Sequence, residues 1–393
     1  MDPIRNPYAP GAGQRPPELA GRDAEVHAFD VVLERVTRGR AERSMILTGL
    51  RGVGKTVLLN ALRSQAVRAG WGTGKLEVRP DQSLRRPVSA ALHMAIRELG
   101  DIDGRDHVLG VLKSFAQKGP AEAKLRDRWQ PGIEVAAVPG RADSGDIEID
   151  LLELFTDVAG LAADAGRGVA VFLDELQDLQ PADVSALCAA CHELSQHRLP
   201  LIIVGAGLPH LPAVLSASKS YSERLFRYSA IDRLDRAAAE RALRTPATEE
   251  DADFTDEALA ELYSLTNGYP YFVQAYGKAV WDIAPASPMT GADVRMAAPE
   301  AESELAVGFF GSRLERATPA EREYLHSMAA VTTADDGSVA TSAVAELLGR
   351  KPQSLSPARD ALLKKGLIYS GERGRIAFTV PHFGRYLRAQ MAD

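Results

Sequence analysis

The feature that most constrains the fold of this chain is a glycine-rich segment, residues 49–56, between an apolar run and a helical pattern. It fits the pattern G-x-x-x-x-G-K-[ST], in which glycines let backbone N–H groups curl around a phosphate without Cβ obstruction. Residues 44–48 predict a buried strand, and residues 55–69 predict a helix with one apolar face. Strand, loop and helix in this order predict a phosphate-binding loop in an α/β protein.

The residues of this loop have distinct expected roles. Lys55 would contact the β- and γ-phosphates of a nucleotide, and the Thr56 hydroxyl would coordinate Mg²⁺. The helix that begins there would direct the positive end of its dipole at the phosphates. The sequence therefore predicts ATP and Mg²⁺ as cofactors. The expected nucleotide contacts of the loop are Gly49, Leu50, Arg51, Gly52, Val53, Gly54, Lys55, Thr56 and Val57.

A second apolar run, residues 169–173, ends in two carboxylates, Asp174 and Glu175. A continuous apolar run of this length is typical of a strand in the middle of a parallel sheet. We expect Asp174 on the metal side of the site. We expect Glu175 near the γ-phosphate, where it would polarise the attacking water, either as a general base or by orienting it. Together with the loop, the acidic pair predicts ATP hydrolysis.

The length of 393 residues predicts about two or three domains. Alternating strand and helix patterns over residues 21–232 predict a parallel-sheet ATPase domain, with an insertion at about 100–150 that contains a charged helix near 121–129 and a short strand near 132–138. The flanking parts are expected as an extended tail (1–20), a helical lid (233–310) and a winged-helix domain (311–393). The net charge of −7 means that the chain as a whole is not basic, as a nucleic-acid-binding protein often is. Any DNA contact must therefore involve a local basic region.

Two further patterns bear on location and chemistry. Residues 1–20 hold five prolines but no apolar core, which favours neither a signal peptide nor a membrane anchor, and a cytoplasmic protein is expected. Cys188, Cys191 and His192 fit the C-x-x-C-H pattern of haem attachment. Such attachment requires export, and the apolar neighbours favour two reduced cysteines in a packed helix.

Three segments together resemble the AAA+ and STAND group of P-loop ATPases, nearest the origin-recognition-type and archaeal members. They are residues 49–56, residues 169–175 and Gly268-Tyr269-Pro270. The resemblance spans about residues 18–283, and a winged helix after the lid also matches initiator-type members. It implies that Arg22, in the segment 19–23, lies against adenine, and that Pro270 belongs to a nucleotide-contacting G-x-P motif of the lid.

The sequence departs from the family pattern in two places. The strand after the acidic pair ends in Val204-Gly205-Ala206-Gly207, which offers no polar sensor residue, and the usual lid arginine is not apparent. These departures favour a switch over a processive motor.

Two arginines follow a predicted helix at about 211–226. The resemblance implies that Arg224 or Arg227, with Arg227 preferred, could be an arginine finger that reaches the γ-phosphate of a neighbouring copy; a solvated surface arginine is the alternative.

The last part of the chain is locally basic, which can attract phosphates. Ser354, Ser356 and Arg359 on its predicted third helix could enter a major groove of duplex DNA. We therefore weigh two functions: a DNA-associated ATPase switch, and a STAND-type signalling ATPase whose nucleotide state controls self-association or partner binding. A small-molecule kinase is disfavoured because no acceptor motif appears. The nine basic residues, set against Glu346, Asp360 and Glu372, are Arg350, Lys351, Arg359, Lys364, Lys365, Arg373, Arg375, Arg385 and Arg388.

Overall fold

The computed structural model describes residues 1–11, 13–80, 82–118, 135–332, 337–370, 372, 374–380 and 382–391. The chain divides into two compact units. The first comprises Met1–Gly21, Gly49–Gly54 and Ile231–Asp393, and the second comprises Arg22–Thr48 and Lys55–Ala230. Each unit is described by itself.

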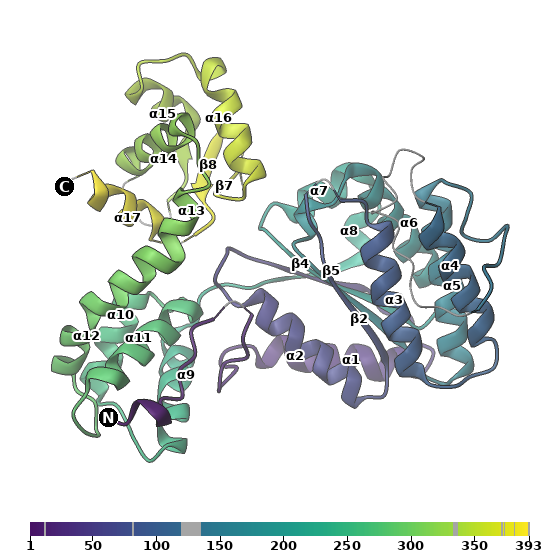
Figure 1. Cartoon of the computed structure of the whole chain (residues 1–393), viewed down its shortest axis with the longest axis horizontal. Helices are drawn as coiled ribbons and strands as arrows, with labels where there is room; N and C mark the ends of the chain where they lie inside the picture. Colours follow the sequence, from purple (N-terminus) through teal and green to yellow (C-terminus); the bar gives the residue numbers. More distant parts are fainter. Residues whose placement is uncertain are drawn as a thin grey trace. The chain divides into compact units, whose positions relative to one another are not determined.

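The second unit is built on a five-stranded sheet in the order β2-β3-β4-β1-β5, and every neighbouring pair is parallel (Figure 1). The carboxyl ends of all five strands therefore meet at one edge of the sheet. The predicted α/β class with a parallel sheet is confirmed. The strands are β1 (Ser44–Thr48), β2 (Gly72–Glu77), β3 (Val169–Asp174), β4 (Leu201–Gly207) and β5 (Phe226–Ala230).

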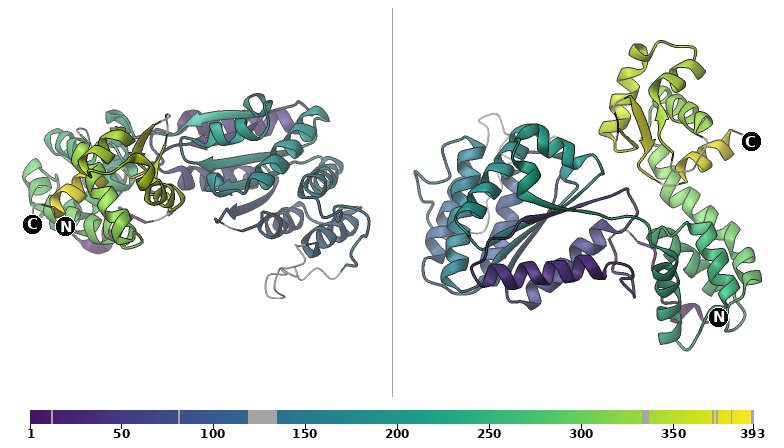
Figure 2. Two further views of the ribbon diagram at one scale, coloured as in Figure 1. Left: turned by 90° about the horizontal axis from the view of Figure 1, so that it is seen from above. Right: turned by 180° about the vertical axis from the view of Figure 1, so that it is seen from behind.

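Helices cover both faces of this sheet (Figure 2). Side chains alternate along β2: Lys75 donates a hydrogen bond to Asn60 of α2, whereas a Cβ at Gly74 would lie 2.3 Å from the carbonyl oxygen of Ala91 in α3. Glycine at this position thus lets the α3 backbone lie directly against the strand. The helices are α1 (Asp23–Thr37), α2 (Lys55–Arg68), α3 (Arg85–Leu99), α4 (Arg105–Gln117), α5 (Ile147–Asp164), α6 (Pro181–Gln196), α7 (Leu211–Ser218) and α8 (Ser222–Leu225).

Some local predictions differ from the structure. The single helix expected at 211–226 is two helices, because the backbone of Lys219 is extended after α7, and β5 begins where the second helix ends. Helix α4 lies inside the segment expected as an insertion, yet its Leu112 and Phe115 belong to the main core. The charged helix expected near 121–129 lies outside the described residues, as does part of the strand expected near 132–138; residues 135–138 form no strand.

A buried ion pair fixes the helices on the α3 face. Arg85 donates to Asp150 over 2.8 Å, and both residues are buried, at 7% and 0% exposure. Arg85 also donates to the carbonyl oxygen of Phe115 and lies 4.4 Å from the centroid of its ring. Burial raises the pKa of Asp150, but hydrogen bonds from Ser144 and Arg85 outweigh it and hold this pKa below its usual value. One pair therefore joins α3, α4 and α5.

In the first unit, the helices of the segment expected as a lid are packed around aromatic side chains, and the N-terminal segment lies against them. Tyr8 is buried and its hydroxyl donates to the carbonyl oxygen of Leu243, while the Trp281 indole donates to the carbonyl oxygen of Asp2. Apart from the short helix η1 (Pro3–Arg5), residues 1–11 carry no regular element. These helices are α9 (Arg236–Glu249), α10 (Asp256–Thr266), α11 (Pro270–Ile283) and α12 (Gly291–Glu304).

A π-helical turn, η4 (Leu305–Gly311), follows α12, and its Phe310 makes aromatic contacts with two other segments of the chain. Phe310 packs against Phe272 of α11 and stacks on Tyr386, with 5.1 Å between ring centroids. The remaining elements include a small antiparallel sheet in the order β6-β8-β7. They are α13 (Ser312–Leu314), α14 (Pro319–Val331), β6 (Val339–Ala340), α15 (Thr341–Leu347), α16 (Pro352–Lys364), β7 (Ile368–Tyr369), β8 (Arg375–Phe378) and α17 (Phe383–Gln390).

In the part of the chain that the structure describes, no helix is both long and apolar enough to span a bilayer.

The buried pair yields a stability prediction. Changing Asp150→Ala leaves the Arg85 charge buried without its carboxylate, so we expect the free energy of unfolding to fall by about 3–5 kcal/mol in urea titrations near pH 7. Because the pKa of Asp150 is lowered, wild type should lose this advantage as the pH falls through that pKa. The control is Asp101→Ala, whose exposed pair with Arg105 should contribute less than about 1 kcal/mol. Equal stability of the two variants contradicts the prediction.

Candidate nucleotide site

The glycine-rich loop joins β1 to α2 in the way its sequence predicts. Gly52 and Gly54 both have φ of +90°, a backbone region that residues with a Cβ rarely adopt. A Cβ at Gly49 would lie 2.2 Å from the carbonyl oxygen of Ile231. Helix α2 begins at Lys55, so its N-terminal N–H groups face the loop, where an anion is stabilised.

One hydrogen bond brings the loop helix to the acidic pair. The Thr56 hydroxyl donates to Asp174 over 2.7 Å, although the residues are 118 positions apart in the sequence. Asp174 is only 6% exposed, and its other carboxylate oxygen accepts from the Glu175 N–H. A hydroxyl and a carboxylate at this separation suit Mg²⁺, which usually takes one or two carboxylates and leaves other positions to water and phosphate.

Glu175 follows β3 in an unusual conformation. Its φ and ψ are 55° and 42°, the left-handed region that residues other than glycine seldom occupy. Gln177 donates from its side-chain amide to the Glu175 carboxylate over 2.6 Å, and its amide oxygen accepts from the Leu208 N–H over 3.1 Å. Sequence analysis missed Gln177. The available signal was a glutamine within one helical turn of the acidic pair.

Positive charge gathers around the loop within the first unit. The Arg51 N–H donates to the carbonyl oxygen of Thr379 over 3.0 Å. Burial, followed by the charges of Arg51 and Arg316, lowers the pKa of Arg313 to about 10. A cation whose charge is disfavoured by burial and by other cations is stabilised when an anion arrives. This side of the loop therefore favours phosphate.

The remaining predicted nucleotide contacts lie in different units. Arg22 precedes α1 in the second unit and is 8% exposed. Pro270 is the first residue of α11 in the first unit, where the Leu234 N–H donates to the carbonyl oxygen of Gly268 over 2.8 Å. Their contacts with a nucleotide stay predictions.

The two candidate arginine fingers are both exposed. Arg224 lies in the short helix α8, and Arg227 lies in β5 opposite Met45 of β1. Among the strands that the structure describes, β5 pairs only with β1, so it lies at an edge of the sheet.

The basic residues near the C-terminus are largely engaged by groups that lie earlier in the chain. Arg350 pairs with Glu323 over 3.0 Å, and Lys365 pairs with Glu321 over 2.6 Å. The same holds for Arg385, which lies 3.5 Å from Glu302, and for Arg388, which donates to carbonyl oxygens of residues 329 and 332. Arg359 contacts Asp360, and Arg375 contacts Glu372 and Ser338. Lys351 and Lys364 are exposed, and Arg373 lies outside the described residues.

The hydroxyls of the third helix face their own backbone. Ser354 donates to the carbonyl oxygen of Lys351, and Ser356 to that of Pro352. The structure therefore leaves fewer groups available to a phosphate backbone than the residue count suggests.

The cysteines are ordinary packed residues, as predicted. Cys188 and Cys191 are unpaired and buried in α6. Burial raises the pKa of the Cys188 thiol to about 11 and raises that of Cys191 further, which makes both unreactive. The His192 ring stacks on Tyr221, with 4.6 Å between ring centroids.

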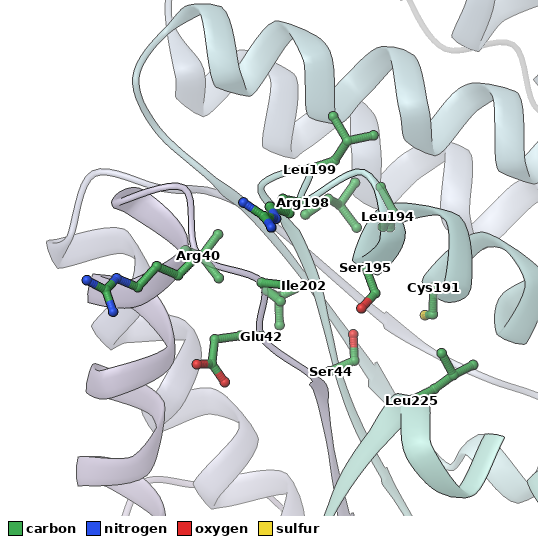
Figure 3. A pocket seen from close by; sticks show the side chains of 13 residues that line it. Arg40, Glu42, Ser44, Cys191, Leu194, Ser195, Arg198, Leu199, Ile202 and Leu225 are labelled. Atoms are coloured by element: carbon green, nitrogen blue, oxygen red, sulfur yellow. The ribbon is translucent and has the colours of Figure 1, made fainter. Parts of the chain in front are cut away.

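A small pocket in the second unit lies away from the acidic pair. Figure 3 shows Ser44 and Ser195 pointing toward each other, with Arg40 and Arg198 farther out. The pocket lies at the amino ends of β1 and β4, which begin at Ser44 and Leu201. Ligands of open parallel sheets bind outside the carboxyl ends, where Asp174 lies, so this pocket is not the candidate nucleotide site.

Comparison with known proteins agrees with this geometry. Residues 18–204 match a family model described as an AAA ATPase domain. This segment of the chain is therefore similar to an AAA ATPase domain. The predicted resemblance to AAA+ P-loop ATPases is thereby confirmed. Outside the ATPase domain, residues 307–387 match a domain of unknown function (DUF8462), and no curated protein matches the chain.

Solved structures of similar fold also include Walker-type ATPases. The Walker-type ATPase PABY2304 of Pyrococcus abyssi is 16% identical, with 95% of this chain and 97% of that chain covered at a TM-score of 0.59, which shows a shared fold. The Holliday junction branch migration motor RuvB of Thermotoga maritima is 18% identical (93% and 96% covered, TM-score 0.45). The Orc1 protein of Aeropyrum pernix, solved in complex with DNA, is 14% identical (96% and 94% covered, TM-score 0.45).

Proposed function

We propose that the chain is a nucleotide-dependent switch that binds Mg²⁺ and ATP at the carboxyl edge of its sheet and hydrolyses ATP slowly. The observation that carries this proposal is the hydrogen bond between Thr56 and Asp174. It places a hydroxyl at the start of α2 beside a carboxylate at the end of β3, with Glu175 next in the chain. Few other chemistries require this combination beside a glycine loop.

In the proposed site, different residues bind the phosphates, hold the metal ion and align the attacking water. Lys55 and the loop N–H groups bind and orient the phosphates, and Thr56 and Asp174 would hold Mg²⁺, which neutralises charge on the phosphate oxygens when bound. Glu175 accepts a hydrogen bond from the attacking water and aligns it with the γ-phosphate. The residues therefore separate into a binding group and one hydrolytic carboxylate.

This division predicts different effects of two substitutions. Glu175→Gln should lower kcat by about 100-fold or more while the ATP dissociation constant stays within about threefold, because the amide keeps the size but loses the basic oxygen. Lys55→Ala should weaken ATP binding itself. Phosphate release and titration of a fluorescent ATP analogue measure the two quantities. The exposed Glu346→Gln is the control. Wild-type turnover by the Glu175 variant refutes the assignment.

We further propose that the C-terminal part of the chain is a winged helix that binds duplex DNA. Elements α14, β6, α15, α16, β7 and β8 follow the helix–strand–helix–helix–strand–strand order of that fold. Lys351 and Lys364, exposed at the two ends of α16, are the cations that this proposal uses. Phosphate contacts of this kind give binding that weakens with salt.

The DNA proposal is tested by charge reversal. The double variant Lys351→Glu and Lys364→Glu should lose about tenfold or more in affinity for duplex DNA at low salt, measured by fluorescence anisotropy with ATP present. The control is Arg68→Glu with Lys118→Glu, which makes the same change in net charge at exposed positions of the ATPase domain. An absence of DNA binding by wild type at low salt overturns the proposal.

A STAND-type signalling ATPase is the second candidate, and the contact between Arg51 and Thr379 favours it. A C-terminal segment that accepts a hydrogen bond from the phosphate loop would sense a rearrangement of that loop when nucleotide binds. The lid segment Gly268-Tyr269-Pro270 agrees with this candidate. In such an assembly, Arg227 or Arg224 of one copy would approach the γ-phosphate of another.

This candidate predicts an ATP-dependent change in assembly. Light scattering should show a larger species with a non-hydrolysable ATP analogue than with ADP, because the two nucleotides favour different states of the loop. Arg227→Ala should leave ATP binding intact and lower turnover per chain at high protein concentration, with the exposed Arg38→Ala as control. One monomeric size with every nucleotide contradicts it.

A further inference from the structure

Gln177 occupies a position between the acidic pair and the neighbouring strand. It lies in the single-turn helix η3 (Leu176–Asp178), directly after β3 and Glu175. Its amide nitrogen donates to the Glu175 carboxylate over 2.6 Å, and its amide oxygen accepts from the N–H of Leu208, the residue after β4. All of these groups belong to the second unit. One side chain thus connects the ends of two adjacent strands.

This bridge requires an amide. The carboxylate of Glu175 only accepts hydrogen bonds, and the Leu208 N–H only donates, so the group between them must donate on one side and accept on the other. An amide does both in one orientation. A carboxylic side chain would set two negative oxygens 2.6 Å apart. A hydrocarbon side chain would satisfy neither group.

The glycines at the end of β4 make room for this arrangement. A Cβ at Gly205 would lie 2.2 Å from a methyl group of Leu176, and a Cβ at Gly207 would lie 3.0 Å from the Gln177 amide oxygen. The strand therefore ends without side chains at the positions that η3 covers. Side chains at these two positions would collide with Leu176 and Gln177.

The packing around Glu175 determines its backbone conformation, and with it the direction of its side chain. A left-handed conformation at a residue other than glycine is unfavourable and persists where the neighbouring structure demands it. Here the chain must turn from β3 into η3 while Leu176 is buried against β4. The Gln177 bond then fixes the carboxylate that the turn has directed.

We propose that Gln177 is a positioning residue for ATP hydrolysis. It orients the Glu175 carboxylate and ties it to the end of β4, the task for which the sequence of that strand supplies no polar side chain. This inference rests on the proposed role of Glu175 in hydrolysis. It adds Gln177 as the residue that orients the Glu175 carboxylate.

The first test removes the amide without changing the size of the side chain. Gln177→Met should lower kcat by roughly 10- to 100-fold, because a misplaced hydrolytic group is costly, while the ATP dissociation constant stays within about threefold. The matched control is Gln180→Met. Gln180 lies in the same connection and makes no capping hydrogen bond at the start of α6.

The second test keeps the length of the side chain but removes its N–H donor. In Gln177→Glu, the new carboxylate cannot donate to the Glu175 carboxylate. The value of kcat should therefore fall as it does in Gln177→Met, while the ATP dissociation constant stays within about threefold. The Gln180→Glu control should keep the wild-type kcat. Retained ATP binding shows that each variant is folded.

The outcomes separate the inference from the function on which it rests. If Glu175→Gln hydrolyses ATP as fast as wild type, or wild type hydrolyses none, the proposed function fails and the inference fails with it. If Glu175→Gln is slow but Gln177→Met turns over like wild type, only the inference is overturned. A wild-type kcat in Gln177→Glu overturns it as well.

Discussion

The hydrogen bond between the Thr56 hydroxyl and the Asp174 carboxylate is the interaction on which the proposed site depends. It forms because all strands of the sheet are parallel, so the loop after β1 and the acidic end of β3 reach the same edge with β4 between them. The core behind that edge is held by apolar contacts and by the buried pair of Arg85 and Asp150. This packing supports the helices that flank the strands and the polar groups at the strand ends.

The intervening strand β4 has a second role through its glycines. Gly205 and Gly207 leave space that Leu176 and Gln177 occupy, and the Gln177 amide then holds Glu175. The start of α2, the acidic pair and the end of β4 are thus connected by hydrogen bonds within the second unit. In the first unit, the Arg51 N–H donates to the Thr379 carbonyl oxygen, and the charges of Arg51 and Arg316 both act on Arg313.

In the C-terminal part, ion pairs with residues from earlier elements offset the positive charge that the local composition predicts. Nine basic residues against three acidic ones predict a strong positive surface, but Glu302, Glu321 and Glu323 from earlier elements pair with Arg385, Lys365 and Arg350. These glutamates stand before the basic segment in the sequence, so a local count does not include them. The DNA proposal consequently rests on Lys351 and Lys364 and on the order of the elements, rather than on the net local charge.

The sequence by itself determined the loop between β1 and α2, the buried strand that ends at Asp174 and the α/β class, because these depend on glycine backbone freedom and on short apolar periodicity. The packed state of Cys188 and Cys191 was likewise predictable from their apolar neighbours. Only the tertiary structure decided the bond between Thr56 and Asp174, the place of α4 in the core and the bridge through Gln177. These depend on which residues distant in sequence become neighbours, and side-chain partners across strands follow from strand order and packing, which no local pattern encodes.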